Sequence, residues 1–467
     1  MKHLLPILYL IVFSFGLQAS GQPSTPSELG YPTAGKPNFI IIFTDDQGYN
    51  DLGCYGSETI QTPHIDRMAK EGRKFTSFYS ASSVCTPSRA ALLTGSYPKR
   101  VGMARGVIFP GDDRGLHPDE VTIAEMLKGA GYATACIGKW HLGHREPFLP
   151  TSQGFDSYYG IPYSNDMNHP DNSGKRGVPR RDASWKDQET AWKAWKTPLM
   201  QDEAIIELPV NQRTITRRYT DKAIQFVNSH KDEPFFLYLP HSMPHVPLFV
   251  PEDAYDPDPQ NAYKATIEHI DAEVGRLMNT VRELGLSDNT YVIFTSDNGP
   301  WLKFDNHGGS ADPLRAGKMT TYEGGHRVPC IAWGPGRIPA GTESDAIATT
   351  MDLLPTMARL SGADLKPRGA IDGLDMSGLL HGKDASPRDE FLYYHMNGAL
   401  HGLRQGDWKL RIANKNDIEL YHLAEDIAES NNLAEQLPER VEALRNRMEE
   451  LDTEIAAKSR PRGEFKP

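Results

Sequence analysis

Side chains able to bind a metal ion, an anion and protons follow four short apolar stretches of this chain: NFIIIFT, ATACIG, PFFLYLP and TYVIFTS. They are carboxylates, an amide, an ammonium group and imidazoles: Asp45, Asp46, Asp297, Asn298, Lys139, His141, His241 and His245. Three carboxylates and an amide oxygen form a hard set of oxygen ligands, which suits calcium or magnesium better than zinc. Taken singly, the two aspartates could cap a helix and Asn298 could form a turn.

A fifth candidate is Cys85, the first residue of C-T-P-S-R. The proline near the start of a helix-forming run predicts that Cys85 lies at a helix N-terminus. There the helix dipole and Arg89 would stabilise an anion. A capped helix with an incidental thiol is the plainer alternative. Cys136 and Cys330 lie in apolar runs and are expected to be buried, and the sequence leaves any pairing with Cys54 open.

The elements that position these residues follow from the hydrophobic pattern. The four apolar stretches and CIAWGPG are β-branched and short, whereas VTIAEMLKGAGY and AYKATIEHIDAEVGRLMNTVRELG have helical periodicity. Apolar strands that alternate with helices predict an α/β fold with a large, mostly parallel or mixed sheet sandwiched by helices. Ligands of such sheets bind at the carboxyl ends of the strands. The polar residues named above are therefore expected to meet at one edge of one sheet.

The pattern changes from about residue 385. EFLYYHM, ALHGLRQG, DWKLRIA and IELYHL alternate like strands of an antiparallel sheet, and PERVEALRNRMEELDTEIAA predicts a closing helix. We therefore expect a catalytic domain at 37–384, with an insertion at 161–215, and a C-terminal α+β subdomain at 385–467. Aromatic and basic residues of the insertion could stack on a ligand ring and bind an anion, or they could pack the insertion onto the domain: Arg180, Arg181, Trp185, Trp192 and Trp195.

The N-terminus has the basic start, short apolar run and small residues of a secretory signal peptide, which we place at 1–21. Its apolar run is short for a membrane anchor, and no later stretch is apolar enough to span a membrane. Residues 22–36 then form a flexible lead-in.

The formal net charge is −11 without any basic run, which argues against non-specific nucleic-acid binding. The expected location is periplasmic or secreted, with a bacterial source inferred.

Several ordered motifs resemble the sulfatase family of the alkaline-phosphatase-like superfamily. The family signature C-T-P-S-R-A-A-L-L-T-G is complete at residues 85–95. The others are F-T-D-D-Q-G-Y, G-K-W-H-L-G, G-I-P-Y-S-N-D, H-V-P-L, S-D-N-G, G-K-M-T-T-Y-E-G-G and L-Y-H-L-A-E-D. Together they span both proposed domains. The resemblance implies an alkaline-phosphatase-like fold and hydrolysis of sulfate esters.

The resemblance also implies the cofactors and the site. Cys85 would be oxidised to formylglycine, by a formylglycine-generating enzyme or an anaerobic sulfatase-maturing enzyme. A calcium ion, with magnesium as the alternative, would be bound by Asp45, Asp46, Cys85, Asp297 and Asn298. The catalytic set would be Cys85, Arg89, Lys139, His141, His245 and Lys318. The resemblance implies that Lys139, His245 and Lys318 also bind the sulfate, with Ser164 orienting the lysine.

The chemistry implied is covalent catalysis by a hydrated aldehyde. One hydroxyl attacks sulfur, while His245 with Lys318 nearby assists departure of the alcohol. The second hydroxyl then loses its proton to His141, and sulfate is expelled. A serine at this position would form a sulfate ester that lacks this exit.

The substrate is expected to be a sulfated glycan or an aryl sulfate, and an exported enzyme favours carbohydrate. Residues in or beside the motifs could contact it: Asp166, His169 and His307, and also His144 and His326.

Two alternatives stay open at this point. One is a phosphonate monoester hydrolase or phosphodiesterase on the same fold, since phosphorus and sulfur oxyanions need similar contacts. The other is a non-catalytic glycan-binding relative, although every expected catalytic position is occupied here. A two-zinc phosphatase would need more histidine ligands.

Overall fold

The chain folds around a ten-stranded mixed sheet whose central strands are the predicted apolar stretches. The computed structural model describes residues 35–169, 181–383 and 385–466. In spatial order the strands are β12 (Thr342–Ser344), β2 (Arg73–Phe75), β11 (Cys330–Trp333), β10 (Thr290–Ser296), β1 (Asn38–Thr44), β9 (Phe235–Pro240), β5 (Ala133–Ile137), β6 (Ser157–Gly160), β7 (Leu199–Gln201) and β8 (Ala204–Glu207).

The central strands β10, β1, β9, β5 and β6 are parallel to one another. The register pairs Thr44 at the end of β1 with Ser296 at the end of β10, and Phe43 with Pro240 at the end of β9. The residues that follow these strands therefore leave the sheet at the same edge. Neighbouring β11 and β7 run antiparallel to this group, which makes the sheet mixed, as predicted.

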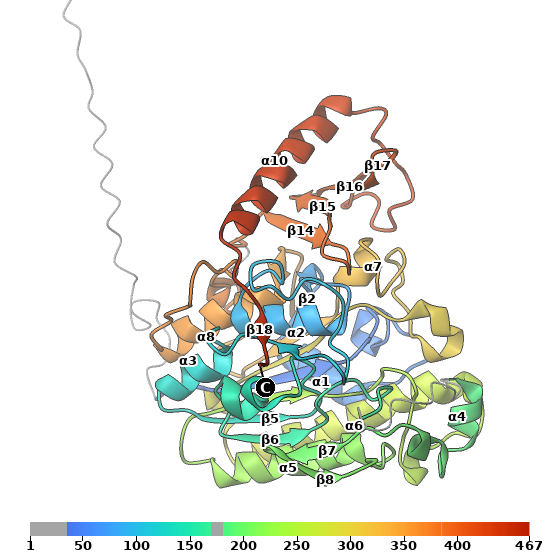
Figure 1. Ribbon diagram of the computed structural model, residues 1–467, viewed down its shortest axis with the longest axis vertical. Helices are drawn as coiled ribbons and strands as arrows, with labels where there is room; N and C mark the ends of the chain where they lie inside the picture. The colour runs from blue at the N-terminus through green and yellow to red at the C-terminus, as the bar shows by residue number, and fades with distance from the viewer. Residues whose placement is uncertain (1–34, 170–180, 384, 467) are drawn as a thin grey trace, which may run out of the picture. The chain divides into compact units, whose positions relative to one another are not determined.

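Both faces of the sheet are covered by helices, so β1, β9 and β10 are buried throughout. Along β1, Ile40 and Ile42 pack in the core that includes α1 (Pro63–Glu71), α5 (Ile215–Ser229) and α6 (Ala262–Glu283). The alternate residues Phe39, Ile41 and Phe43 pack in the core of the other face. That core includes α2 (Cys85–Thr94), α3 (Ile123–Gly129) and α8 (Leu353–Ser361), as Figure 1 shows. Alternating side chains buried on both sides explain why this strand is apolar from Phe39 to Phe43.

A second sheet lies in the C-terminal part of the chain. Its four antiparallel strands follow one another as β14 (Glu390–Tyr394), β15 (Leu400–Gln405), β16 (Trp408–Asn414) and β17 (Asp417–His422). Helix α10 (Pro438–Ala457) contacts β15 and β16, and Leu444 and Met448 lie in the same core as Leu403 and Leu410 (Figure 1). The predicted small antiparallel sheet with a closing helix is thereby confirmed.

The remaining elements are short. Two strand pairs are β3 (Phe78–Tyr79) with β13 (Ala348–Thr349), and β4 (Arg114–Gly115) with β18 (Gly463–Glu464). Short helices are α4 (Asp182–Lys186), α7 (Glu323–His326) and α9 (Ser377–Leu380). In the insertion, Trp185 and Trp195 are buried, and the Trp185 indole donates a hydrogen bond to the Asp256 carbonyl. These two tryptophans pack the insertion onto the body, the second of the two alternatives above.

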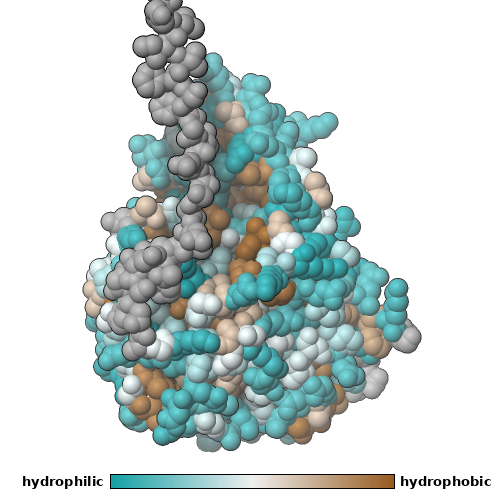
Figure 2. Space-filling view, turned by 90° about the vertical axis from the view of Figure 1, so that its left-hand side faces the viewer, coloured by the Kyte–Doolittle hydropathy of each residue, from teal (hydrophilic) through white to brown (hydrophobic). Residues whose placement is uncertain are grey.

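Some sequence predictions fall outside the described residues: the signal peptide at 1–21, the lead-in as far as residue 34, and Arg180 in the insertion. Among the described helices, none combines the length and the apolar character needed to cross a membrane. The face seen in Figure 2 is mainly hydrophilic over the described residues. All four cysteines are free, and Cys136 and Cys330 are buried as expected.

Candidate active site

The ends of β1 and β10 bring the predicted oxygen ligands together. The Asp46 backbone amide donates to Asp297 Oδ1 at 3.1 Å, and the Asn298 side-chain amide donates to Asp46 Oδ1 at 2.8 Å. Asp45, Asp46, Asp297 and Asn298 are all buried. Asp46 has φ of 63°, a left-handed conformation that is uncommon for a residue with a side chain and that often marks a functional site.

Cys85 is the first residue of α2, as predicted, and lies beside these carboxylates. Its Sγ is 3.4 Å from Asp45 Oδ1. One ligand atom from each of Asp45, Cys85 and Asp297 lies within 4.8 Å of the others, and the same holds for Asp46, Cys85 and His245. Burial and the Asp45 charge raise the pKa of the Cys85 thiol well above its usual value. The expectation that the helix dipole and Arg89 stabilise an anion at this position stays a prediction from the sequence.

Three buried cations surround this cluster. Arg89 donates to Asp297 Oδ2 from Nη2 at 2.8 Å and to the Lys139 carbonyl from Nη1 at 2.9 Å. Lys139 Nζ is 2.5 Å from Asp45 Oδ2, and Lys318 Nζ is 2.5 Å from Asp46 Oδ1 and 3.7 Å from Cys85 Sγ. The guanidinium thus fixes the carboxylate of Asp297, while the two ammonium groups flank the position of the sulfur.

The donor set fits a hard divalent cation. Asn298 Oδ1 is buried without a hydrogen-bond partner among the described residues, so an amide oxygen is available. Burial and the neighbouring Asp45 carboxylate raise the pKa of Asp297 to about 7, and burial also raises that of Asp46. Carboxylates whose pKa is raised in this way are stabilised by a nearby positive charge. Asp45, Asp46, Asp297 and Asn298 could therefore hold calcium or magnesium.

His141 presents one ring nitrogen as a proton acceptor. Its Nε2 lies 3.0 Å from the Ile108 carbonyl oxygen, so Nε2 carries the hydrogen in that bond. Nδ1 is buried and has no hydrogen-bond partner among the described residues. Thr86 Oγ1 fixes the arrangement, because it donates to the His141 carbonyl and accepts from the Ile108 amide. Burial, together with Lys139 and Arg89, holds the pKa of His141 well below its usual value, so the ring is neutral.

His245 is oriented from its other side. Its Nδ1 lies 2.7 Å from the Val246 carbonyl and 3.0 Å from Asn165 Oδ1, and both oxygens accept, so Nδ1 carries the hydrogen. Nε2 then lies 3.6 Å from Asp46 Oδ2. Burial and the Lys318 charge hold the pKa of His245 well below its usual value. Ser164 Oγ lies 3.2 Å from Lys139 Nζ and 3.5 Å from His245 Nδ1, between the two groups.

These groups open into a cavity of about 380 Å³. Cys85, His141, Ser164, His245 and Lys318 line its polar part together with Asp166. Much of the remaining wall is apolar: Val84, Val107, Phe109, Met167, Trp301, Met319 and Met396. The cavity is therefore a pocket with a charged interior end and an apolar wall, as expected of a small-molecule site.

The other sequence candidates lie outside the lining of this cavity. His307 Nε2 is 3.3 Å from Asp182 Oδ1, beside the insertion, and His326 Nδ1 is 3.0 Å from the Ser80 carbonyl. The His169 backbone amide bonds the Lys196 carbonyl, and the His144 ring packs edge-on against Tyr163. Contact of His169 or His307 with a substrate stays a prediction from the sequence.

Sequence reasoning missed three groups of the site. Asn165 orients His245, the Ile108 carbonyl orients His141, and Trp301 lies over the Lys318 ammonium group at 4.4 Å. Asn165 lies within the quoted motif G-I-P-Y-S-N-D, and Trp301 lies two positions after S-D-N-G, so both could have been suspected. Nothing in the sequence marks the Ile108 carbonyl, because a backbone group has no residue type.

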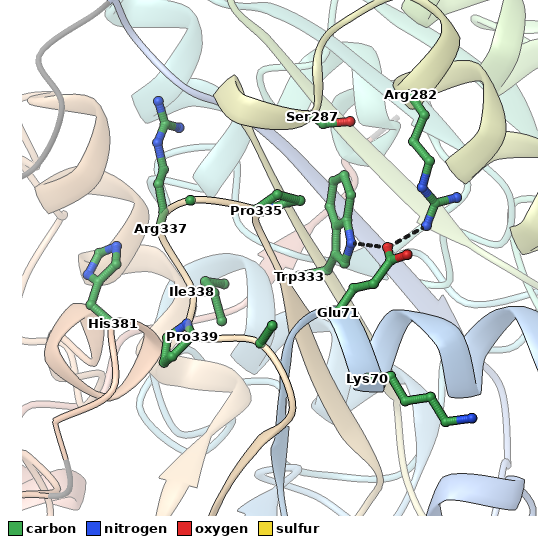
Figure 3. Close-up of a pocket in the computed structure, with 12 residues that line it drawn as sticks. Lys70, Glu71, Arg282, Ser287, Trp333, Pro335, Arg337, Ile338, Pro339 and His381 are labelled. Carbon is green, nitrogen blue, oxygen red and sulfur yellow. Dashed lines mark hydrogen bonds and ion pairs between the residues drawn. The ribbon is translucent and has the colours of Figure 1, made fainter.

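A larger pocket of about 800 Å³ lies at the opposite edge of the sheet, beyond the C-terminal end of antiparallel β11. In Figure 3, dashed lines join Glu71 to Trp333 and to Arg282. Glu71 accepts hydrogen bonds from the Trp333 indole at 3.0 Å and from Arg282 at 2.8 Å. Arg337 donates to Asn289 at 2.8 Å. The described residues of this pocket form no cluster of metal-binding groups.

Comparisons with known proteins agree with this geometry. The family model described as Sulfatase matches residues 37–363, and the model described as N-sulphoglucosamine sulphohydrolase, C-terminal, matches residues 316–455. Arylsulfatase G of Rattus norvegicus is 38% identical over 394 residues, which cover 80% of this chain and 74% of that protein. N-acetylgalactosamine-6-sulfatase of Sus scrofa is 38% identical over 379 residues, which cover 79% of this chain and 68% of that protein.

Solved structures show the same likeness. The crystal structure of Ps i-CgsB in complex with k-i-k-neocarrahexaose superposes with a TM-score of 0.77 at 30% identity, covering 89% of this chain and 92% of that one. The phosphonate monoester hydrolase SpPMH from Silicibacter pomeroyi gives a TM-score of 0.64 at 20% identity, covering 90% and 96%, and shares the fold. The family model covers well over half of the chain, and the curated relatives exceed 30% identity. The chain therefore belongs to the sulfatase family and is a hydrolase of sulfuric esters.

Proposed function

We propose that this sulfatase acts on sulfate esters of carbohydrates, with a formylglycine made from Cys85 as its nucleophile and a calcium ion bound beside it. The observation that carries the proposal is the position of Cys85. Its Sγ stands where an oxygen of the modified residue would lie, 3.4 Å from a buried carboxylate and 3.7 Å from the Lys318 ammonium group. The raised pKa of the thiol makes the unmodified cysteine a poor nucleophile, which favours the modified form.

Asp45, Asp46, Asp297 and Asn298, with the modified residue 85, would hold the ion, and magnesium is the alternative to calcium. The bound ion would supply positive charge that lowers the pKa of a nucleophilic hydroxyl and stabilises sulfate oxygens. The aldehyde, once hydrated, would supply one hydroxyl for attack on sulfur and a second whose deprotonation releases sulfate. Arg89 would keep Asp297 ionised and oriented through its two hydrogen bonds to that carboxylate.

Lys139 and Lys318 would bind the sulfate group at the interior end of the cavity. Both ammonium groups are buried, so their charges act on a bound anion with little screening by water. Ser164 Oγ accepts a hydrogen bond from the Lys139 ammonium group at 3.2 Å. Such preorganised donors stabilise the charge that builds up on sulfate oxygens in the transition state.

The two histidines would move the protons. His141 offers its unprotonated Nδ1 as the acceptor for the release step, because the Ile108 carbonyl keeps the hydrogen on Nε2. His245 would donate to the departing alcohol from Nε2. A bound sulfate would offset the Lys318 charge that lowers the pKa of His245, and so would favour protonation of that ring.

The substrate class rests on the relatives and on the cavity. One relative is named N-acetylgalactosamine-6-sulfatase, and one similar structure contains a neocarrahexaose. A cavity of about 380 Å³ with an apolar wall and Asp166 near its polar end has room for a sugar ring that presents an axial or equatorial sulfate. Aryl sulfates would enter the same cavity as smaller substrates.

A phosphonate monoester hydrolase or phosphodiesterase activity is the alternative, because the similar phosphonate monoester hydrolase shares the fold. Paired kinetics on 4-nitrophenyl sulfate, 4-nitrophenyl phosphate and a phenyl phosphonate monoester would separate the two. We expect kcat/KM to be highest for the sulfate. A higher value for a phosphorus ester would overturn the assignment of substrate.

We further propose that the enzyme is exported to the periplasm or beyond, after cleavage of a signal peptide at 1–21. Residues 37–384 would form the catalytic domain, with the insertion at 161–215, and residues 385–467 a C-terminal subdomain. A formylglycine-generating or anaerobic sulfatase-maturing enzyme would be the partner during biogenesis.

The test compares the chain produced with and without a maturing enzyme. Trypsin releases the peptide Phe75–Arg89, and conversion of its cysteine lowers the peptide mass by a fixed amount because oxygen replaces sulfur with loss of two hydrogens. We expect hydrolysis of 4-nitrophenyl sulfate to rise in proportion to the converted fraction. Equal activity of unconverted and converted protein would contradict the proposed nucleophile.

A further inference from the structure

The motif G-K-M-T-T-Y-E-G-G contains a glutamate, Glu323, that does not line the catalytic cavity. The same motif carries Lys318, whose ammonium group does. Two residues beside this lysine, Ala316 and Met319, have φ of 61° and 71°. Such conformations cost free energy for residues with a side chain, and they persist where the surrounding structure holds them.

The loop of residues 315–322 rests directly on the backbone of α7. The Gly324 amide donates to the Arg315 carbonyl at 2.9 Å, and the Gly299 amide donates to the Gly325 carbonyl at 3.2 Å. A Cβ added at Gly299 would lie 1.7 Å from the Gly324 carbonyl oxygen, so these backbones leave no space between them. The position of α7 therefore determines where the Lys318 loop lies relative to the residues that follow β10.

Helix α7 is in turn held by charges from the C-terminal sheet. Glu323 Oε1 is 2.9 Å from Nζ of Lys409, a residue of β16. Lys409 Nζ is also 2.7 Å from Glu429 Oε1, and the other oxygen of Glu429 accepts the Glu323 backbone amide at 2.7 Å. The side chains of this triad are fully buried. Tyr393 of β14 adds a hydrogen bond to Glu323 Oε1 at 2.6 Å.

The buried charges of this triad depend on one another. Burial opposes ionisation of Glu323, but Lys409 with Arg327 and Arg404 outweighs it, and the pKa of Glu323 stays well below its usual value. Removal of the lysine would leave two buried carboxylates facing each other, and an uncompensated buried charge is strongly unfavourable. Glu429 itself has φ of 51°, so the triad includes a strained residue as well.

We infer that the Glu323–Lys409–Glu429 triad is a positioning device for the proposed reaction: through α7 it holds the Lys318 loop in its strained conformation and sets where the ammonium group meets the sulfate. The C-terminal sheet thereby contributes to catalysis without contact with the reacting atoms. The inference rests on the proposed role of Lys318. It assigns Glu323, Lys409 and Glu429 a positioning role that differs from a general contribution to stability.

The test uses Glu429→Gln and the charge-balanced double variant Lys409→Met with Glu429→Gln, in the full-length protein. The double variant removes the positive charge of Lys409 together with the negative charge of Glu429. Glu323 keeps Arg327 as a partner at 3.5 Å, so we expect the double variant to fold. The matched control is Arg388→Met, which removes a buried ion pair with Asp352 that makes no part of the triad. All variants are compared at equal formylglycine content and saturating calcium, by kcat and KM for 4-nitrophenyl sulfate and by Tm.

We expect the double variant to lose at least tenfold in kcat and the Glu429 variant to lose less, whereas the Arg388 variant keeps kcat within twofold for a similar fall in Tm. If the double variant had a lower Tm but an unchanged kcat, the triad would have only a structural role, and the inference would be overturned.

A cycle with Lys318→Ala separates the inference from the proposed function. In that background we expect the double variant to lower kcat by less than threefold, because the lysine that the triad positions is gone. If the double variant lowered kcat by the same factor in the Lys318→Ala background as in the original chain, the inference would be overturned. The role of Lys318 would then stand. If Lys318→Ala itself kept the original kcat, the proposed role of Lys318 would fail first, and the positioning role with it.

Discussion

Two pockets lie at opposite edges of the ten-stranded sheet, and the smaller one is the proposed site of the chemistry. The catalytic cavity measures about 380 Å³, the other about 800 Å³, and each contains carboxylate, cationic and tryptophan side chains. In the larger pocket Glu71 is bound by Arg282 and the Trp333 indole. Beside the catalytic cavity, three buried carboxylates lie together with Arg89, Lys139 and Lys318. Asn298 Oδ1 and His141 Nδ1 are left without partners among the described residues.

The difference teaches that crowded buried charges beside unpartnered polar atoms mark a candidate site more surely than volume does. Burial of a polar atom without a partner costs free energy, and a folded chain retains such atoms where a ligand or reaction uses them. Among the described residues that line the larger pocket, Glu71 is the one carboxylate, and it is paired with Arg282. Changes in the two pockets should therefore have very different effects.

The largest effect is expected from Cys85→Ser. Serine offers one hydroxyl and, unlike a hydrated aldehyde, has no second hydroxyl for the release step. We expect no more than one turnover per protein molecule, with a stable sulfate ester on residue 85 detectable by mass spectrometry after incubation with substrate. Repeated turnover by this variant would show that the catalytic cavity works by another chemistry.

The second largest effect is expected from removal of the metal ion. Because three buried carboxylates need positive charge, treatment with a chelator is expected to lower kcat by at least about a hundredfold, the scale of lost electrostatic stabilisation of a transition state. Calcium should restore activity and raise Tm in proportion to its binding. Asp297→Asn is the matched variant, and it should bind calcium more weakly; unchanged calcium affinity in that variant would place the ion elsewhere.

Lys318→Ala should lower kcat by roughly a hundred- to a thousandfold, as the loss of one charged donor at a developing oxyanion does. KM should change less than kcat if the ammonium group acts mainly in the transition state. Arg282→Ala in the larger pocket is the paired control, since its guanidinium also binds a carboxylate. A comparable loss of kcat in both variants would remove the contrast between the pockets.

His241 tests how far the catalytic region extends. It follows β9, as His245 does, but it does not line the cavity. Burial, with His269 nearby, lowers its pKa to about 3, so the folded chain keeps the ring neutral. A lowered pKa in the folded state gives stability that is present above the unfolded value of about 6.5 and is lost as pH falls towards 3. Between pH 7 and pH 5 this loss amounts to about 2 kcal/mol.

In His241→Asn that part of the pH dependence should disappear, while kcat at pH 7 stays within about threefold. Denaturant titrations at pH 7 and pH 5 give the two free energies of unfolding for each protein. If the variant and the original chain lost stability equally on acidification, His241 would not be the neutral buried group described above.

The smallest effect is expected from Arg337→Ala in the larger pocket. Its side chain bonds Asn289, so a modest fall in Tm is expected, with kcat and KM within twofold of the original values. Steady-state kinetics on a small aryl sulfate and on a sulfated oligosaccharide check this together. A selective loss with the oligosaccharide would give the larger pocket a role in substrate binding.

Much of the site could be predicted because strand ends are visible in sequence. Apolar stretches such as NFIIIFT identify buried parallel strands, and the rule for strand ends places Asp45 beside Asp297 although 251 residues separate the two positions. The register of β1 with β10 confirms this. The C-terminal sheet was equally visible from its alternating pattern and turns.

The rest depends on backbone groups and on contacts between distant segments. The Ile108 carbonyl sets the tautomer of His141, yet any residue type could supply that oxygen. The charge of Lys409 is paired across 86 positions with Glu323, and a short alternating strand gives no sign of such a partner. Burial and the Asp45 charge raise the pKa of the Cys85 thiol, and neither is apparent from a local motif.

The most direct test of the central claim is a crystal structure of the Cys85→Ala protein with calcium. The account predicts one ion bonded at about 2.3–2.6 Å to oxygens of Asp45, Asp46, Asp297 and Asn298, beside residue 85 and near Lys318. An ion bound elsewhere, or these four side chains free of any ion at saturating calcium, would contradict it.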